Sequence, residues 1–492
     1  MRRPGPGINW RLVLPVVASA LGAVGLGMVV CLAIALVRGD GGVLAFAAPA
    51  AAVLALAAGG LAWARRLRQL PLRPRDGFLA VSLAWLAAGL AGAAPFLVEG
   101  TFTNVARAIF ESMSGITTTG ATVITDIEAQ PDAILFWRSL TQWLGGAGIV
   151  VLVVAVAPAT GLASSRVFFA ETSGVTADRL TPRIADTAKI VWGLYLAFTF
   201  IGLAAYLLAG MRPFDAVNHT FTSVATGGFS TRNASIAAFD SLAVELVALG
   251  LMVLGAINFA FYYRVLRGMS LWPQAGEVRI FLAILAGAIA VVTLSLALDD
   301  PATRIWAHLR EAAFSVTSVM TGTGYTTADF DAWNDFGRAM VLLLMFVGGC
   351  AGSAAGGLKV IRVLLLAKIG AQEITRQLRP RAVQVLRIRN HVYSEELRRG
   401  VLGFAAIYLL VVLAGTLTML AAGLDLVSAF AAAAATVNIV GPGLGEIGAF
   451  ETYASVSDGG LLVLTFLMLA GRLEVFTLLV LLTPAFWRRN IA

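Results

Sequence analysis

The chain has 492 residues, of which 59% are hydrophobic and 13% are charged. Soluble domains carry about 25% charged residues, so the composition excludes an ordinary soluble protein and indicates a polytopic α-helical membrane protein. The formal net charge is +8, but the basic clusters lie beside apolar runs, as expected of loops between membrane spans and not of a nucleic-acid-binding surface. Cys31 and Cys350 lie in or beside apolar stretches and predict no disulfide framework.

Several apolar runs are long enough to cross a hydrocarbon core of about 30 Å. We predict ten spanning helices, at about residues 11–37, 43–64, 78–97, 134–158, 187–210, 240–264, 280–298, 337–369, 400–421 and 460–484. The first run resembles a signal peptide, because Arg2 and Arg3 precede it and Ala18-Ser19-Ala20 looks like a cleavage site. It continues to about Val37, beyond the usual signal core of about 7–15 residues, which favours an uncleaved helix.

The basic residues predict the orientation of the chain in the membrane. Cytoplasmic loops are indicated by the tract 65–75, by Arg264 and Arg267, by the run 376–399 and by Arg488-Arg489. With ten crossings, these positions place both termini in the cytoplasm.

Four five-residue segments with glycine in fourth place recur about every hundred residues. They read Thr117-Thr118-Thr119-Gly120-Ala121, Ala225-Thr226-Gly227-Gly228-Phe229, Thr321-Gly322-Thr323-Gly324-Tyr325 and Asn438-Ile439-Val440-Gly441-Pro442. Each follows an amphipathic segment too short to cross the membrane: 104–116, 214–225, 305–320 or 424–437. This layout predicts re-entrant pore helices and loops, since irregular backbone at membrane depth is tolerated only where it faces protein or a water-filled cavity.

We therefore predict an all-α polytopic membrane protein with four parallel helix–pore-loop–helix repeats around one pore, plus an N-terminal helix pair. The predicted units are the extension 1–77 and the pore repeats 78–160, 187–268, 280–370 and 400–492. One Thr/Gly loop alone would be explained equally well by helix packing through small residues. Four copies with the same flanks favour a selectivity filter.

The four motifs have the chemistry of a monovalent-cation filter. Backbone carbonyls and hydroxyls supply oxygen ligands without a fixed geometry, and glycine lets the backbone turn its carbonyls inward. No carboxylate, which calcium would favour, and no basic residue, which an anion would favour, lies inside a motif. The fourth loop departs most from the others, because it begins with Asn438 and continues into Pro442-Gly443. The predicted potassium-binding residues are Thr118, Thr119, Gly120, Thr226, Gly227, Gly228, Gly322, Thr323, Gly324, Ile439, Val440 and Gly441.

A glycine-rich segment, residues 348–357, interrupts the run 337–369. It holds five glycines, each costing about 1 kcal/mol relative to alanine in a helix, so we predict a break here on the cytoplasmic side of the third loop. A mobile gating loop is the favoured interpretation, and a close-packed Gly/Ala helix face is the alternative. The predicted gate residues are Gly348, Gly349, Gly352, Gly356, Gly357, Lys359 and Arg472.

Arg472 lies near the middle of the last apolar run, where a charge is costly and normally faces a cavity or a partner. We expect it to point at the pore and limit conduction, or to contact the glycine-rich segment. The alternative is a structural ion pair with Glu474 or Glu111. His219, His308 and His391 are too scattered for a metal site and are expected in inner or outer loops.

Several stretches resemble those of bacterial TrkH potassium-uptake subunits, within the Trk/Ktr/HKT superfamily. They are residues 111–122, 227–231, 346–362, 438–445 and 471–476. The N-terminal helix pair favours TrkH over the related KtrB. One departure is that Ser353 is followed by Ala354-Ala355, where family loops often read Gly-Ser-Thr-Gly-Gly; this makes the segment more compatible with a helix.

The resemblance implies potassium uptake across the bacterial inner membrane by a homodimer with one pore per protomer. It also implies a cytosolic TrkA-like nucleotide-binding regulatory subunit, a glycine-rich gate and an arginine in the pore. Potassium is then the transported substrate; no organic cofactor and no nucleic-acid partner are expected, and membrane lipid surrounds the chain. Two alternatives stay open: a sodium-coupled or weakly selective KtrB-like transporter, and, less consistent with the short loops, a polytopic membrane enzyme.

Overall fold

The structure is a computed structural model that describes residues 8–39, 42–67, 73–159, 184–269, 274–379, 387–388, 391–392 and 394–487. Apart from the two-residue strands β1 (Arg387–Ile388) and β2 (His391–Val392), which pair antiparallel, the regular structure in these ranges is helical. The predicted all-α class is confirmed. The predicted positions of the termini, with Arg2, Arg3 and Arg488-Arg489, lie outside the described residues.

The helices fall into three groups by their place in the chain; those named long have 13 to 29 residues, and those named short have 12 to 16. The long helices are α1 (Trp10–Arg38), α2 (Val43–Arg66), α3 (Pro74–Gly92), α6 (Asp132–Ala159), α8 (Ile184–Leu208), α10 (Leu242–Ala256), α12 (Gln274–Asp299), α14 (Asp335–Val347), α15 (Val360–Leu378), α16 (Glu395–Ala421) and α18 (Asp458–Arg472). The four short helices that precede the glycine motifs are α5 (Val105–Ile116), α9 (Pro213–Val224), α13 (Ile305–Met320) and α17 (Leu426–Val437). The remaining pieces are α4 (Ala94–Glu99), α11 (Phe259–Leu266), α19 (Phe476–Leu482), α20 (Pro484–Trp487) and the 3-10 turns η1 (Ser235–Phe239), η2 (Phe330–Ala332), η3 (Gly445–Ile447) and η4 (Tyr453–Ser455).

Within the described residues, six helices are long and apolar enough to cross a membrane, and two bent helix pairs raise the number to as many as eight. Of the two other predicted spans, 134–158 coincides with α6, whose side chains are described only as far as residue 148. The span 337–369 covers the 13-residue α14, the glycine-rich segment and the first half of α15. The chain is a multi-pass membrane protein.

Two predicted helices are wrong as continuous elements. The predicted span 240–264 is bent by 94° between α10 and α11, and the predicted span 460–484 is bent by 119° between α18 and α19. At the first bend the glycine-rich segment binds the freed backbone groups, because Cys350 N donates to Ala256 O at 2.8 Å and Phe259 N donates to Gly352 O at 3.3 Å. Apolar content alone predicts a continuous helix at each of these two places, because it does not reveal the distant residues that bind the backbone at a bend.

Glycines bring three long helices into backbone contact with the ends of the short helices. Each of these glycines lies against the carbonyl oxygen of the last residue of the short helix before it. An added Cβ would lie 3.3 Å from that oxygen at Gly255 and would overlap it at Gly145 and Gly471. The pairs are Gly145 of α6 with Ile116 of α5, Gly255 of α10 with Val224 of α9, and Gly471 of α18 with Val437 of α17. The same contact therefore fixes the short helix against the long helix in three of the four units.

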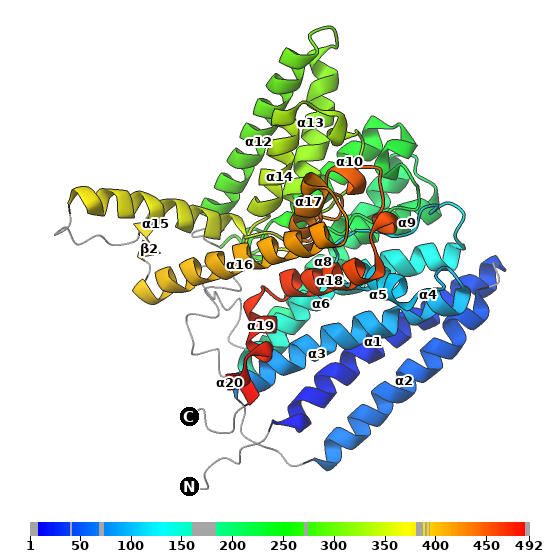
Figure 1. Ribbon diagram of the computed structural model, residues 1–492. Helices are drawn as coiled ribbons and strands as arrows, with labels where there is room; N and C mark the ends of the chain where they lie inside the picture. The colour runs from blue at the N-terminus through cyan, green and yellow to red at the C-terminus, as the bar shows by residue number, and fades with distance from the viewer. Residues whose placement is uncertain are drawn as a thin grey trace.

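The C-terminal halves of the four short helices are largely buried, whereas two thirds of the apolar window of α1 and of α2 is not. In Figure 1, α1, α2 and α3 lie side by side on one flank, α12 and α13 stand together, and α15 projects to one side with α16 next to it. The largest cluster of buried apolar side chains extends from α1 and α3 through α5 and α6 to α17 and α18, and a second cluster lies around α8 to α10.

Replacing Gly145 with alanine should destabilise the fold, because its Cβ would overlap the Ile116 carbonyl and the backbone cannot move away easily. Overpacking of this kind costs about 1–3 kcal/mol. Thermal unfolding of the protein purified in detergent measures the effect. Gly148→Ala on the same helix is the matched control, because the nearest atom to its Cβ would be 4.0 Å away, on Trp85. Equal unfolding midpoints for the two variants would contradict the packing.

Candidate ion pathway

The four short helices end in the same backbone motif. We name the segments that follow them loop 1 (117–121), loop 2 (225–229), loop 3 (321–325) and loop 4 (438–442). In each loop the amide of the third residue donates to the carbonyl five residues earlier at 2.8–2.9 Å, and the amide of the second residue donates to the carbonyl three residues earlier at 3.0–3.3 Å. This pair of hydrogen bonds is a Schellman motif, which ends a helix with one left-handed residue.

Left-handed backbone occurs at the second and fourth residues of every loop. The second residues are Thr118, Thr226, Gly322 and Ile439, with φ of 60°, 51°, 70° and 59°. The fourth residues are Gly120, Gly228, Gly324 and Gly441, with φ of 84°, 76°, 80° and 96°. Three of the second residues are β-branched, and each such conformation costs about 1–3 kcal/mol. The alternating backbone is thus held by its surroundings.

The loops close into a ring. A Cβ added at the fourth-position glycine of each loop would meet the carbonyl oxygen of the third residue of the next loop. The pairs run from Gly120 to Gly227, from Gly228 to Thr323, from Gly324 to Val440 and from Gly441 back to Thr119, the last with 2.7 Å between the added Cβ and the oxygen. Each loop therefore adjoins the next, and third-position carbonyls from all four loops lie around one axis.

The ring is only approximately fourfold. In loops 1 and 3 the hydroxyls of the first and third residues are hydrogen-bonded, Thr117 to Thr119 at 2.7 Å and Thr321 to Thr323 at 2.8 Å. Loop 2 lacks both hydroxyls. In loop 4 the first residue is Asn438, whose amide oxygen accepts a hydrogen bond from the Tyr408 hydroxyl. The short helices all direct their C-terminal, partly negative ends toward the loops, which favours a cation there.

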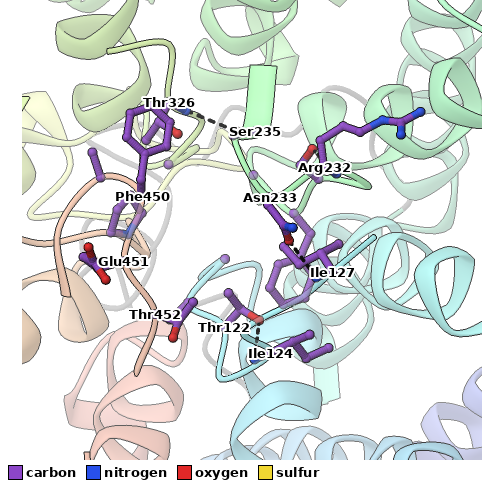
Figure 2. A pocket seen from close by; sticks show the side chains of 18 of the residues that line it. Thr122, Ile124, Ile127, Arg232, Asn233, Ser235, Thr326, Phe450, Glu451 and Thr452 are labelled. Carbon is purple, nitrogen blue, oxygen red and sulfur yellow. Dashed lines mark hydrogen bonds between the residues drawn. The ribbon is translucent and has the colours of Figure 1, made fainter. Parts of the chain in front are cut away.

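A cavity of about 100 Å³ lies on the side of the ring where the loops end. Each loop contributes a lining residue: Gly120, Gly228, Gly324 and Pro442. Figure 2 shows the side chains of Thr122, Asn233, Thr326 and Glu451 around this cavity, contributed by four separate segments of the chain.

The N-terminal end of α17, the short helix before loop 4, is capped by a carboxylate. Asp425 accepts a hydrogen bond from the amide of Val427 at 2.9 Å at the start of α17. The side-chain hydrogen bond with Ser428, together with the backbone amides of Val427 and Ser428, holds the pKa of Asp425 below its usual range. Asp425 thus satisfies the free backbone amides at the start of α17, the end of the helix that points away from the ring.

The glycine-rich segment lies on the opposite side of the ring, where the loops begin. Gly357 N donates to Asn438 O at 3.1 Å, and a Cβ added at Gly322 would lie 3.3 Å from Gly356 N. Between Val347 and Val360 the backbone is not helical, although Ala354 and Ala355 are compatible with a helix. The segment thus contacts loops 3 and 4 on the side where they begin. Its backbone also forms hydrogen bonds with the joint between α10 and α11.

Lys359 and Arg472 hold this segment from two sides. The Lys359 ammonium donates to Ala355 O at 2.6 Å. The Arg472 guanidinium is buried and donates to Ala354 O at 3.1 Å and to Gly145 O of α6 at 2.9 Å. It therefore links the segment to the helix that supports loop 1.

The alternative ion pairs considered for Arg472 are taken by other arginines. Glu474 pairs with Arg362 at 2.5 Å, and Glu111 pairs with Arg138 at 2.9 Å. Glu474 and its neighbour Val475 are left-handed, with φ of 57° and 51°, where α18 ends. The backbone between α18 and α19 is therefore strained. The Glu474–Arg362 ion pair joins it to α15, the helix that follows the glycine-rich segment.

The structure brings the twelve predicted filter residues together in the ring and the predicted gate residues together beneath it. Four side chains that bind the loops or the chain beside them were not predicted as site residues. They are Gln142, which donates to Gly227 O at 2.6 Å; Tyr325, whose hydroxyl lies 2.5 Å from Thr222 Oγ1; Asp331, which accepts from Gly445 N at 2.9 Å; and Tyr453, which donates to Gly441 O at 2.7 Å. Their partners lie 12 to 114 residues away, so spacing along the chain gives no signal for these contacts.

Two of the histidines were misplaced by the sequence interpretation. His219 lies on α9 and is fully buried, with its ring nitrogens against Asp215 O at 2.8 Å and Ser230 Oγ at 2.9 Å. His308 lies on α13 and contacts Asp300 O at 3.1 Å. In the part of the chain that the structure describes, no three His, Cys, Asp or Glu side chains are grouped to hold a metal ion.

Comparison with known proteins gives consistent matches over the whole chain. Residues 45–489 match the TrkH family, described as cation transport protein. A Trk system potassium uptake protein TrkH from Vibrio parahaemolyticus is 39% identical over 488 residues, 98% of this chain and 100% of that protein. The Escherichia coli K12 protein of the same description is 40% identical over 441 residues, 88% of this chain and 91% of that protein.

A solved structure matches as well. The crystal structure of the potassium transporter TrkH from Vibrio parahaemolyticus has a TM-score of 0.86 and 39% identity, covering 97% of this chain and 99% of that one. The helical order, the ring of loops and these matches agree: the chain belongs to the TrkH family of cation transport proteins.

Proposed function

We propose that this protein takes up potassium across the bacterial inner membrane, with the ring of loops as its selectivity filter. The observation that carries the proposal is the closure of the ring, in which third-position carbonyls from all four loops lie around one axis. Carbonyl rings replace the hydration shell of potassium in filters of this kind. The relatives are named as potassium uptake proteins, not as enzymes, which supports the same conclusion.

The proposed filter consists of the backbone and hydroxyl oxygens of loops 1 to 4. The proposed repeats are residues 78–160, 187–268, 280–370 and 400–492, each contributing one loop, and residues 1–77 are an added helix pair. Support comes from the Schellman motif and the left-handed positions that all four loops share, and from the glycine contact between long and short helices in three of them.

The proposed gate is the glycine-rich segment 348–357 with Lys359 and Arg472. It covers the inner side of loops 3 and 4, and a cation passing inward through the ring would meet it next. Because its backbone is bound by a few long-range hydrogen bonds and not by a continuous helix, it can move without unfolding a helix. Arg472 adds a positive charge that opposes a passing cation.

We further propose a homodimer whose gate is regulated by a cytosolic TrkA-like subunit, with both termini in the cytoplasm. The relatives are named as parts of a Trk system, which supports a protein that works with partners. A weakly selective, KtrB-like cation transporter is the second candidate. The hydroxyl pairs present only in loops 1 and 3 favour it, because an uneven ring discriminates ions of different size less sharply.

Growth of a potassium-uptake-deficient bacterium at low potassium tests the proposal directly. We expect the chain, expressed with a TrkA-like regulatory subunit, to restore growth at limiting potassium, because the ring supplies the ligands of a dehydrated potassium ion. Well-expressed protein that restores no growth with its regulatory subunit present would count against potassium uptake.

Gly324→Ser should relax the selectivity of potassium over sodium, because its Cβ would overlap the Val440 carbonyl of the neighbouring loop. We expect at least about a tenfold loss, which corresponds to ~1.4 kcal/mol. Competitive uptake into liposomes measures it. Gly210→Ser is the matched control, because Gly210 is also left-handed, with φ of 90°, but has open space around it. If both variants keep the wild-type selectivity, the filter is assigned to the wrong residues.

Arg472→Ala should raise the potassium flux. The change removes two charge-assisted hydrogen bonds, worth about 1.5–3 kcal/mol each, that hold the glycine-rich segment against α6 and beneath the ring. We expect an increase of about tenfold in the flux per molecule reconstituted in liposomes, since ~1.4 kcal/mol of that loss shifts the gate equilibrium tenfold. A folded variant with unchanged or reduced flux would mean that the arginine only supports the structure.

A further inference from the structure

A buried ion pair lies behind the ring, between loops 1 and 2. The Arg138 Nε atom of α6 is 2.9 Å from Glu111 Oε1 of α5, and the side chains are 1% and 0% exposed. Burying two charges is costly, and such a pair persists only when its remaining hydrogen-bonding atoms are also satisfied. The neighbouring atoms show where those hydrogen bonds go.

Glu111 binds the chain that leaves loop 1. Its carboxylate accepts hydrogen bonds from the Thr122 hydroxyl at 2.9 Å and from Val123 N at 2.9 Å. Thr122 follows two residues after Gly120, whose Cα lies against the Gly227 carbonyl of loop 2. A shift of the carboxylate would therefore move the outer end of loop 1.

Arg138 binds the last residue of loop 2 and the residue that follows it. Its guanidinium donates to Ser230 O at 3.0 Å and lies over the Phe229 ring at 4.1 Å from the centroid. Phe229 directly follows Gly228, so the contact is one residue from the ring. The pair thus joins two pieces of backbone that start at neighbouring points of the ring.

The other three junctions of the ring use neutral groups or a partly exposed carboxylate. The Tyr325 hydroxyl of loop 3 contacts Thr222 in the short helix before loop 2, and Tyr453 binds Gly441 of loop 4 and Thr122 just after loop 1. Asp331, which follows loop 3, accepts from Gly445 beyond loop 4; it is 24% exposed and pairs with the partly exposed Arg338 at 3.2 Å. Among the described residues, the junction between loops 1 and 2 is the one held by a fully buried ion pair.

We propose that the Glu111–Arg138 pair positions loops 1 and 2 and thereby determines how well the ring distinguishes potassium from sodium. This inference rests on the proposed potassium filter. The pair touches no ion; it acts through Thr122 and Phe229, which fix the spacing of the carbonyls. Two ions that differ by a few tenths of an ångström in radius are distinguished only if that spacing is held.

Competitive uptake of potassium and sodium into liposomes, with the full chain, tests the proposal. Glu111→Gln and Arg138→Gln should each lower the potassium-to-sodium uptake ratio by at least about fivefold, because each leaves one buried charge without its partner. Glu245→Gln is the matched control. It breaks the pair between Glu245 of α10 and Arg310 of α13, whose atoms lie 2.8 Å apart and in which Arg310 is 45% exposed. This variant should keep the wild-type uptake ratio.

A milder variant keeps the test independent of folding. Thr122→Val keeps both charges and the ion pair but removes the hydroxyl that binds Glu111 and lies 3.3 Å from Arg138 Nη2. It should lower the uptake ratio in the same direction, with potassium uptake retained. An unchanged ratio in folded Thr122→Val and Glu111→Gln would overturn the proposal.

A purely electrostatic role gives a different result. It predicts that Glu111→Gln weakens and Arg138→Gln strengthens the apparent affinity for potassium, with an unchanged uptake ratio, and that outcome would also overturn the positioning role. Wild-type protein that takes up no potassium in this assay, beside a working positive control, would instead refute the proposed function itself.

Discussion

The close approach of each fourth-position glycine to the carbonyl of the next loop is the contact on which the rest of the structure depends. Non-helical backbone inside a membrane must face protein or a water-filled cavity, and the four loops of the ring face one another. The short helices must then end at one level, which the shared Schellman motif achieves. The long helices must approach those ends closely, which Gly145, Gly255 and Gly471 permit.

Backbone strain is concentrated along the same path. The left-handed residues other than glycine are eight in the described part of the chain, and six of them lie in the ring, at Lys359 or at the joint after Arg472. Such conformations persist only where the surroundings impose them, and they cluster at sites that must keep or change a particular shape. The strain is thus concentrated in the ring of loops, at the end of the glycine-rich segment and at the joint behind Arg472.

The sequence predicted what periodicity and composition encode locally. The four short helices begin and end within two residues of their predicted positions, and the break at 348–357 followed from the cost of five glycines. The bends after Ala256 and after Arg472 were missed, because the first depends on hydrogen bonds to residues about a hundred positions away and the second on left-handed Glu474. The Glu111–Arg138 pair was missed for the same reason: both residues are ordinary until the fold brings them together.

Covalent continuity of the ring has a consequence for how its properties can change. In a pore assembled from four identical subunits, one substitution alters four walls at once. Here one substitution alters one wall, so the ring can drift in small steps, and a device such as the Glu111–Arg138 pair can exist at one junction without being repeated at the others. The hydroxyl pairs of loops 1 and 3, which loops 2 and 4 lack, show that the walls of this ring already differ from one another.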